Sequence, residues 1–572
     1  MNGFLRDERQ SRSPMSSSVH IFGTLFRNCL HRVKRCDNGA QNGRVGANGF
    51  HGIDGFFLCS LRPIFTVVFD RSPIVLKLNR NLIADGHLKV EASAPSSLKP
   101  VRILQIGDGN FLRAFADWMI DVANGAGLFN GRVTMAQPLA RGIADLMKAQ
   151  DCLYTVLLRG VQNGVAVDSR RVVSCVEKVL IPYAEWDAML ATAQDTSLRF
   201  VISNTTEAGI AYTEEPLLDG QCPGSFPAKV TALLLARFKA LGGTASSGLV
   251  FLPCELIEAN ATKLRAYVLQ YAEAWKLPAE FVIWVREHNV FCNTLVDRIV
   301  PGFPAAEAEA LYAQFGYKDP LLVAAEPFLL WVIEGPAAIA EELPLHKAGL
   351  DVVWTTDLQP YRTRKVRILN GAHTASSLAA FCAGLDTVQS MTEDLVVSKF
   401  LSRVMFEEIV PFVPLPDAER LAYAQTIMER FANPSIRHEL ISIALNSVSK
   451  WQVRVLPTVK DYAAKHGRAP AGLSFSLAAL LNFYHGKFVE GGEYEGQRQG
   501  QTYPIRDSAD VLAILDAAWQ YSDDLSRVVA RVLADTRLWG EDLTRVSGLA
   551  EQTASALARI KAVGVKAAMA EL

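Results

Sequence analysis

The chain has 572 residues, of which 50% are apolar and 20% charged, and its formal net charge is −1 at pH 7. This length predicts two or three domains with sizeable cores, and the balanced charge argues against nucleic-acid binding, which usually needs a basic excess. Nine cysteines without a C-x-x-C pair are typical of reduced cytoplasmic thiols rather than of a disulfide framework or a zinc ribbon. No run of about 18 uninterrupted apolar residues occurs, so we expect no membrane span.

The first 95 residues differ in composition from the rest of the chain. They include "MNGFLRDERQSRSPMSSSVH" and "NGAQNGRVGANGFHGIDG", which are rich in Arg, Ser and Gly and poor in acids. Such a segment can bury little apolar surface. We therefore expect residues 1–95 to be a disordered extension or sequence upstream of a misplaced start. An Arg-rich organelle transit peptide is the third alternative.

A strand, a glycine turn and a helix open the predicted fold. Residues 101–106 form an apolar strand, and Gly107 and Gly109 follow it. Apolar residues then recur every three or four positions, which indicates a helix that ends at Asn124 and Gly125. Because "RVTMAQ" (132–137) reads as a second strand, this unit predicts a parallel sheet. Further strand candidates are "YTVLLRG", "RFVISNTT" and "GLVFLPCEL", separated by helical patterns such as "PAKVTALLLARFKALG".

After residue 355 helical patterns dominate, as in "TASSLAAFCAGL", "AERLAYAQTIMERFAN" and "LSFSLAALLNFYHG". The sequence therefore predicts a Rossmann-like α/β dinucleotide-binding domain over 96–355 and a mainly α-helical domain over 356–572. Ligand sites favour junctions between domains.

The glycine turn is a candidate phosphate site, because backbone amides at a helix N-terminus can face a phosphate. The dinucleotide fingerprint G-x-G-x-x-G is incomplete, since Leu112 stands at the third glycine. The acid expected after the second strand is also missing, and the residues near that place are Arg132, Gln137 and Arg141. A plain structural turn is the alternative, and the residues themselves leave NAD and NADP both open.

The stretch "KVRILNGAHT" places Lys365, Asn370 and His373 close together. On a helix Asn370 and His373 share a face, and the flexible stem of Lys365 can reach the same place. Reducing a ketone requires a proton donor and hydrogen-bond donors aimed at the developing oxyanion. The ordinary lysine pKa of about 10.4 is high for a base, but nearby like charges would lower it. The candidates are Arg362, Arg364 and Arg367. A solvated basic strand followed by a packed histidine is the alternative.

Several motifs, in order from about residue 100 to the C-terminus, resemble the polyol-specific long-chain dehydrogenases, the group that contains mannitol dehydrogenase. They are "IGDGNFLRAF", "SNTTEAGI", "PCELIEANA", "FCNTLVDRIVPG", "KVRILNGAHTA", "RFANPSIRHELISIALNSVSKW" and "GQTYPIRD". The resemblance implies an N-terminal dinucleotide-binding domain, a mainly helical C-terminal domain and no metal. Residues 1–95 have no counterpart in it.

The resemblance also implies roles for individual residues. Lys365 would be the general acid/base, Asn370 and Asn260 would bind the oxyanion, and His373 would contact or orient the substrate. Lys450 matches a substrate-contacting lysine of the family pattern. The family's cofactor loop tolerates a third residue other than glycine and would take NAD here; it matches Gly107, Gly109, Asn110, Phe111 and Arg113.

The implied reaction is the reversible, NAD-dependent reduction of the keto-uronate D-tagaturonate to D-altronate in hexuronate breakdown. A carboxylate needs a cation, and Arg454 lies four residues after Lys450, on the same face if the helix persists. The alternatives are fructuronate reduction, a mannitol-type polyol dehydrogenase, an isomerase with a tightly held nicotinamide, and a non-catalytic sugar-acid sensor. We expect a small-molecule substrate and neither nucleic acid nor membrane as a partner; the sequence does not specify the oligomeric state.

Overall fold

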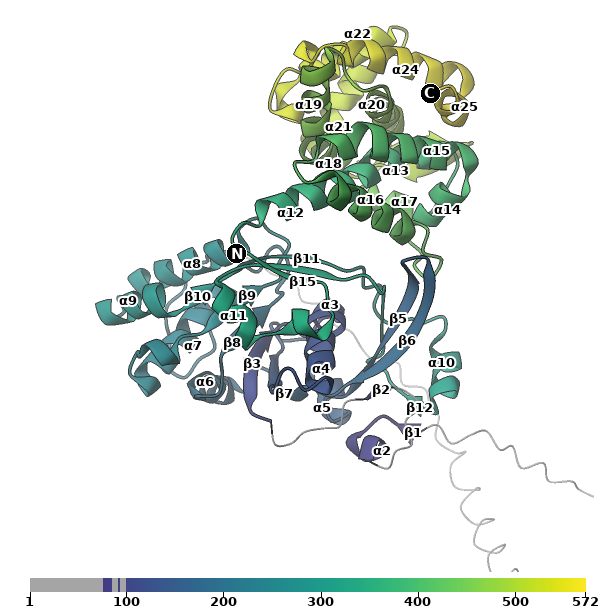
Figure 1. Ribbon diagram of the computed structural model, residues 1–572. Coiled ribbons are helices and arrows are strands. Elements are labelled where there is room, and N and C mark those ends of the chain that lie inside the picture. The colour runs from purple at the N-terminus through teal and green to yellow at the C-terminus, as the bar shows by residue number, and fades with distance from the viewer. Residues whose placement is uncertain (1–75, 85–90, 93–98) are drawn as a thin grey trace, which may run out of the picture. The chain divides into compact units, whose positions relative to one another are not determined.

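The computed structural model describes residues 76–84, 91–92 and 99–572 (Figure 1). Two short segments extend the fold before residue 96, where the sequence analysis began it. Strand β1 (Leu76–Lys77) pairs with β12 (Tyr317–Lys318), and β2 (Glu91–Ala92) pairs with β6 (Val165–Val173). Leu78, just before helix α2 (Arg80–Ala84), is 1% exposed, and Leu82 within this helix is 8% exposed. The predicted extension is thus corrected for these residues, and the rest of it lies outside the described residues.

A parallel sheet carries the first half of the fold. Within the described residues it has six strands in the order β10-β9-β8-β3-β4-β7, and all neighbours are parallel. The strands are β3 (Val101–Ile106), β4 (Arg132–Ala136), β7 (Val176–Leu180), β8 (Phe200–Ser203), β9 (Val250–Pro253) and β10 (Val290–Phe291). The strands at 101–106, 132–137, 199–206 and 248–256 were predicted. Both faces of this sheet are covered, which explains why the sequences of its strands are continuous apolar runs.

Two hydrophobic cores lie on the two faces. Because successive strand residues point to opposite sides, Ile103 enters one core and Leu104 the other. The Leu104 core contains helices α6 (Trp186–Gln194), α7 (Phe226–Leu241), α8 (Asn260–Ala274) and α9 (Ala279–His288). The Ile103 core contains α5 (Ala144–Ala149) and one helical run made of α3 (Asn110–Leu112), a π-helical segment (Arg113–Asp117) and α4 (Trp118–Gly125) (Figure 1).

Two smaller sheets complete this half. The first has the order β13-β5-β6-β2, with β5 (Tyr154–Gln162), β6 (Val165–Val173) and β13 (Val323–Ala325). The second is β11-β14-β15, with β11 (Asn293–Asp297), β14 (Leu330–Glu334) and β15 (Val352–Thr355). The predicted strand "YTVLLRG" therefore belongs to an antiparallel hairpin. Asn163 and Gly164, with φ of 52° and 73°, form its turn, which is the Asn-Gly pair that such hairpins favour.

Short helices connect these sheets: α10 (Ala308–Phe315), α11 (Ala337–Glu342) and two 3₁₀ turns (Ala245–Ser247 and Leu345–Ala348). Among the described residues, no helix combines the length and the apolar character that crossing a membrane requires.

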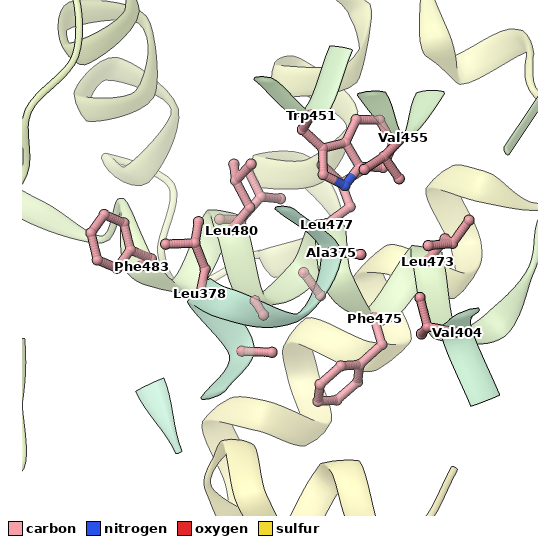
Figure 2. Packing of buried hydrophobic residues seen from close by; sticks show 14 of the residues in the cluster. Ala375, Leu378, Val404, Trp451, Val455, Leu473, Phe475, Leu477, Leu480 and Phe483 are labelled. Atoms are coloured by element: carbon pink, nitrogen blue, oxygen red, sulfur yellow. The ribbon is translucent and has the colours of Figure 1, made fainter. Parts of the chain in front are cut away.

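The second half is mainly helical, as predicted, around one large core. Figure 2 shows the middle of this core, where Ala375 and Leu378 of α13 meet Leu477 and Leu480 of α20. Its α-helices are α12 (Gln359–Arg364), α13 (Ala372–Cys382), α14 (Val388–Glu393), α15 (Leu395–Arg403), α16 (Asp417–Phe431), α17 (Leu440–Ile443), α18 (Ser447–Arg454), α19 (Leu456–His466), α20 (Ala471–Phe483), α21 (Ala509–Trp519), α22 (Leu525–Ala534), α23 (Thr536–Trp539), α24 (Leu549–Val563) and α25 (Val565–Ala570).

The predicted fold class, an α/β Rossmann-like half followed by a mainly helical half, is thus confirmed. The helical half also holds two π-helical segments (Lys365–Gly371 and Val404–Ile409), two 3₁₀ turns (Val410–Phe412 and Leu543–Arg545) and a small antiparallel sheet that was not predicted. The strands of that sheet are β16 (Gly486–Phe488), β17 (Tyr494–Arg498) and β18 (Gln501–Pro504). The boundaries at 95/96 and 355/356 stay predictions.

Candidate active site

The two glycines after β3 serve different purposes. Gly107 has a φ of +136°, and a Cβ there would lie 2.9 Å from the Asn204 carbonyl oxygen and 3.0 Å from Leu112 Cδ1. Only glycine adopts this backbone conformation without strain in so little space. Gly109 has an ordinary φ of −69°, and a Cβ there would meet no atom within 4 Å. Gly107 is therefore required by the turn itself, whereas Gly109 leaves open space in front of the helix that begins at Asn110.

A cavity of about 520 Å³ lies over this turn. The strand order changes direction between β3 and β8, and ligands of open α/β sheets bind at the carboxyl ends of the strands at such a point. Residues that follow both strands line the cavity, among them Gly107, Gly109, Asn204, Thr205 and Thr206. The turn, the open space at Gly109 and the helix N-terminus fit the pyrophosphate of a dinucleotide.

The other predicted cofactor-loop residues are placed differently. Phe111 stacks on Phe115 with ring centroids 4.8 Å apart and lines a second cavity. Arg113 is 4% exposed, and its guanidinium donates to the Leu321 carbonyl and to Asn110 Oδ1, both at 2.6 Å. Neither Asn110 nor Arg113 lines either of the two cavities, so this pair holds the start of the helix to a neighbouring segment.

The place after β4, where a ribose-binding acid was sought, holds the buried Gln137. Its amide donates to the Leu139 carbonyl and accepts from the Ala144 amide, and Arg141 is exposed. An acid does line the cavity from the glycine turn: Asp108, which accepts from the Ile143 amide at 3.0 Å.

The second cavity, of about 530 Å³, adjoins the first, because Asn204, Thr206 and Ala208 line both. Its other lining residues are Phe111, Glu207, Leu256, Val296, Asp297, Arg298 and Lys365. Residues from the carboxyl end of the parallel sheet and the lysine from the helical half therefore line one continuous groove.

Lys365 lies inside a helical run rather than at its first turn. The run begins at Gln359, continues as a π-helix over Lys365–Gly371 and becomes α13. A π-helix bonds residue i to i+5, so Lys365 and Asn370 lie one turn apart; such segments often occur at functional sites. The Lys365 ammonium donates to the Val296 carbonyl at 2.7 Å.

The pKa of Lys365 is lowered, chiefly by burial of the amine. The Asp297 carboxylate opposes this shift, and three positive neighbours add to it: Arg430, Arg454 and Arg362. The lowering was expected, but from the adjacent arginines alone. Of these, Arg362 is among the main influences on Lys365, whereas Arg364 stacks on a tyrosine ring and Arg367 pairs with an aspartate.

Sequence reasoning missed a buried ion network beside Lys365. Arg430 on α16 contacts Asp297 at the end of β11 and Glu326 just after β13, and all three side chains are at most 6% exposed. Burial alone would raise the pKa of Asp297, but the Arg430 guanidinium holds it below its usual value. The available signal was charge inside apolar sequence, as in "NTLVDRIV", since buried charges normally need partners.

Asn370 and His373 are partly buried and do not line the Lys365 cavity. The His373 ring stacks on Phe431 at 4.9 Å and meets the edge of His438 at 5.0 Å. Burial first, and then nearby positive groups, lower the pKa of His373 to about 3, so its imidazole is neutral at pH 7. Its Nε2 atom is buried and has no hydrogen-bond partner among the described residues.

Lys450 lies in the middle of α18 and Arg454 at its end. Lys450 donates to the Ile443 carbonyl at 2.9 Å, and Arg454 donates to Thr374 Oγ1 at 3.4 Å. Burial lowers the pKa of both side chains. In the described part of the chain, neither has an acidic partner within 4.0 Å. The positive charge of Arg454 also lowers the pKa of both Lys365 and His373.

Asn260 is not brought to this cavity. It is 1% exposed at the start of α8, and its amide nitrogen donates to the carbonyls of Pro253, Glu255 and Thr294. Its oxygen accepts two backbone amides. Both atoms are thus occupied by backbone, and from the same stretch it is Leu256 that lines the cavity.

Comparison with known proteins gives consistent matches over both halves. Residues 101–347 match the mannitol dehydrogenase Rossmann domain, and residues 357–561 match the mannitol dehydrogenase C-terminal domain. Proteins named altronate oxidoreductase are 44% identical over 481 residues in Yersinia enterocolitica and 42% identical over 479 residues in Halalkalibacterium halodurans. Both alignments cover 83% of this chain, and 98% and 93% of the respective relatives.

Two solved structures share the fold. Mannitol 2-dehydrogenase of Pseudomonas fluorescens, in a ternary complex with NAD and D-mannitol, has a TM-score of 0.62 at 22% identity, covering 87% of this chain and 99% of that one. A substrate-free D-sorbitol dehydrogenase has a TM-score of 0.71 at 24% identity, covering 86% and 100%. With both domains matched in order over most of its length, the chain belongs to the mannitol dehydrogenase family.

Proposed function

We propose that this protein catalyses the reversible, NAD-dependent reduction of D-tagaturonate to D-altronate, as an oxidoreductase of hexuronate breakdown. The relatives named altronate oxidoreductase support the substrate. The observation that carries the reaction type is the groove in which a cavity over a glycine turn adjoins a cavity containing a lysine amine. A cofactor-binding part over 96–355, a substrate and catalytic part over 356–572 and a cytoplasmic location belong to the same proposal.

NAD is the proposed cofactor, with its pyrophosphate over Gly107 and Gly109, and it would supply or accept the hydride. The neighbour solved with NAD shares this fold, and the space at Gly109 supports the position of the phosphates. Asn204 lines both cavities and Phe111 lines the second, so both would border the nicotinamide end. Asn110 and Arg113 would act by holding the helix start in place.

Lys365 is the proposed general acid/base. In reduction its ammonium gives a proton to the carbonyl oxygen as hydride reaches the carbon, and in oxidation its amine takes that proton back. The lowered pKa favours the neutral amine that oxidation needs. Asn370, one π-helical turn away, is the proposed oxyanion donor. Asn260 has no amide hydrogen free for this role, so its proposed contribution is to hold β9 and β11 together.

The helical half is proposed to bind the rest of the substrate. The free Nε2 of the neutral His373 can bond a hydroxyl group. Lys450 and Arg454 are the proposed partners of the carboxylate, because they are partly buried cations without an acidic partner among the described residues. Burying the substrate carboxylate without a partner would be costly. The two cations would therefore pair with it when the substrate binds.

The proposal is tested by following NADH oxidation with D-tagaturonate, D-fructuronate, D-fructose and D-tagatose. We expect the largest kcat/KM with D-tagaturonate and altronate as its product. A larger kcat/KM with fructuronate or with a neutral ketose would replace the substrate assignment and keep the reaction type. Tight binding of the sugar acids without any turnover would show a sensor.

A further inference from the structure

Arg430 forms four hydrogen bonds with two buried carboxylates. Its Nη2 and Nη1 atoms donate to Asp297 Oδ1 at 2.9 Å and Oδ2 at 3.1 Å. Its Nε and Nη2 atoms donate to Glu326 Oε2 at 3.0 Å and Oε1 at 2.9 Å. Tyr423 OH donates to the same Asp297 Oδ2 at 3.3 Å. Since Arg430 and Tyr423 lie on α16 and the acids lie among the strands, this network ties the two halves together.

Lys365 borders this network without joining it. Its amine donates to the carbonyl of Val296, the residue before Asp297, and both Lys365 and Asp297 line the cavity. Within the described residues, Lys365 and Asp297 form no ion pair at 4.0 Å or less. Opposite charges attract strongly where water is excluded. The missing pair therefore has a cause in the structure: both oxygens of Asp297 are already bound by Arg430.

We propose that Arg430 is a positioning residue for Lys365. By binding Asp297 and Glu326, it prevents Asp297 from capturing the Lys365 ammonium and leaves the amine on the Val296 carbonyl, facing the cavity. The catalytic use of this arrangement rests on the proposed function. The arrangement itself does not, because it concerns only the amine and its surroundings.

Two effects of Arg430 point the same way. Its own positive charge lowers the pKa of Lys365, and it competes for Asp297, whose charge raises that pKa. The groups that act on Lys365 or share its cavity come from several elements; they are Asp297, Arg298, Glu207, Arg362, Arg430 and Arg454. Burial is the largest influence, and Asp297 is the acid among these groups that opposes it, so freeing Asp297 from Arg430 should make the amine more basic.

Replacing Arg430 alone would leave two buried carboxylates without a cationic partner, which is strongly destabilising. The informative variant is therefore R430M/E326Q, which removes one positive and one negative charge and leaves Asp297 free to pair with Lys365. The matched control is R430M/E326Q/D297N, in which no carboxylate of the network remains. Both proteins are first checked for a cooperative thermal transition.

The first measurement is the titration of the Lys365 amine by NMR of protein labelled at lysine Cε, with K365M to assign the signal. We expect its pKa to rise by on the order of one unit in R430M/E326Q and to return towards the wild-type value in the control. An unchanged pKa in the double variant would overturn the proposal. So would an equal rise in both variants, since the rise would then not depend on Asp297.

The second measurement is the pH profile of kcat/KM for altronate oxidation. Its lower limb should move to higher pH by the same amount in R430M/E326Q and recover in the control. If wild type turns over no altronate, the proposed function fails while the NMR titration still decides the role of Arg430. A uniform loss of rate with an unmoved limb would leave Arg430 a purely structural tie and overturn the proposal.

Discussion

Replacing Arg454 or Lys450 by methionine should damage the use of a sugar acid far more than the use of a neutral ketose. Among the described residues each side chain has a single hydrogen-bond partner, Ile443 O for Lys450 and Thr374 Oγ1 for Arg454. The Arg454 contact is long, at 3.4 Å, so little of the fold depends on it. Methionine keeps most of the apolar stem and removes the charge.

The expected size follows from the bond that is lost. A hydrogen bond between charged groups is worth about 1.5–3 kcal/mol, which corresponds to about 10- to 150-fold in kcat/KM. Turnover of D-tagaturonate should therefore fall by this factor in R454M, while turnover of D-fructose or D-tagatose should change by less than about threefold. Because the resemblance implies that Lys450 contacts the substrate in polyol dehydrogenases too, K450M should lower both activities, and the activity on the acid more strongly.

The assay is initial-rate NADH oxidation over a range of each substrate at constant ionic strength. R437M is the matched control, because Arg437 is a neighbouring arginine whose side chain is 78% exposed and pairs with Glu439. It should leave both activities unchanged. Equal losses on the acid and on the ketose in R454M would refute the reasoning, since the side chain would then position hydroxyls or the helix, and some other group would bind the carboxylate.

Three further predictions concern the catalytic amine, the cofactor turn and the N-terminal segments. K365A should lose roughly 10²–10⁴ in turnover with NADH affinity nearly unchanged, and near-native turnover would contradict the assignment. In the wild type, the rate of altronate oxidation should rise with pH through a lysine pKa below about 10.4. G109V should weaken NADH binding by about tenfold or more in a titration, because its side chain fills the open space proposed for the phosphates. Unchanged NADH affinity in G109V would place the phosphates elsewhere. G107A should instead lower the melting temperature through about 1–3 kcal/mol of backbone strain. A chain that starts at Ser97 should be less stable to urea than one that starts at Arg71, because it lacks two buried leucines worth about 1.5–3 kcal/mol each; equal midpoints would show that these leucines add nothing.

The sequence predicted those parts of the fold whose causes are local. The strand 101–106, the glycine turn and the following helix are specified by residues next to one another, and the structure has them at these positions. The hairpin at Asn163 and Gly164 was equally local but was overlooked. Its first strand reads as a buried apolar run, like a strand of the parallel sheet, and only the Asn-Gly turn distinguishes the two. The short β1–β12 pair depends on a partner far along the chain, which composition does not reveal.

The candidate site divides in the same way. The sequence predicted a helix that carries Asn370 and His373, and the structure adds a π-helical segment that places Lys365 and Asn370 one turn apart. The lowered pKa of Lys365 was expected for a reason that proved incomplete. Burial lowers it most, and Asp297, at the end of strand β11, opposes the lowering. Asn260 could not be placed from the sequence in this way. A motif match does not reveal that backbone groups already bond both the nitrogen and the oxygen of its side chain.

The basicity of Lys365 therefore depends on the contact between the two halves of the chain. Asp297 comes from strand β11 and Arg430 from α16. The Asp297 carboxylate beside the amine is therefore paired with Arg430 only when α16 packs against the strands. A change that loosens α16 should raise the pKa of Lys365 even if it touches no residue of the cavity, because it frees Asp297. Thus the same ion network that joins the halves also sets the proton affinity on which the proposed chemistry depends, and stability and activity should fall together when it is weakened.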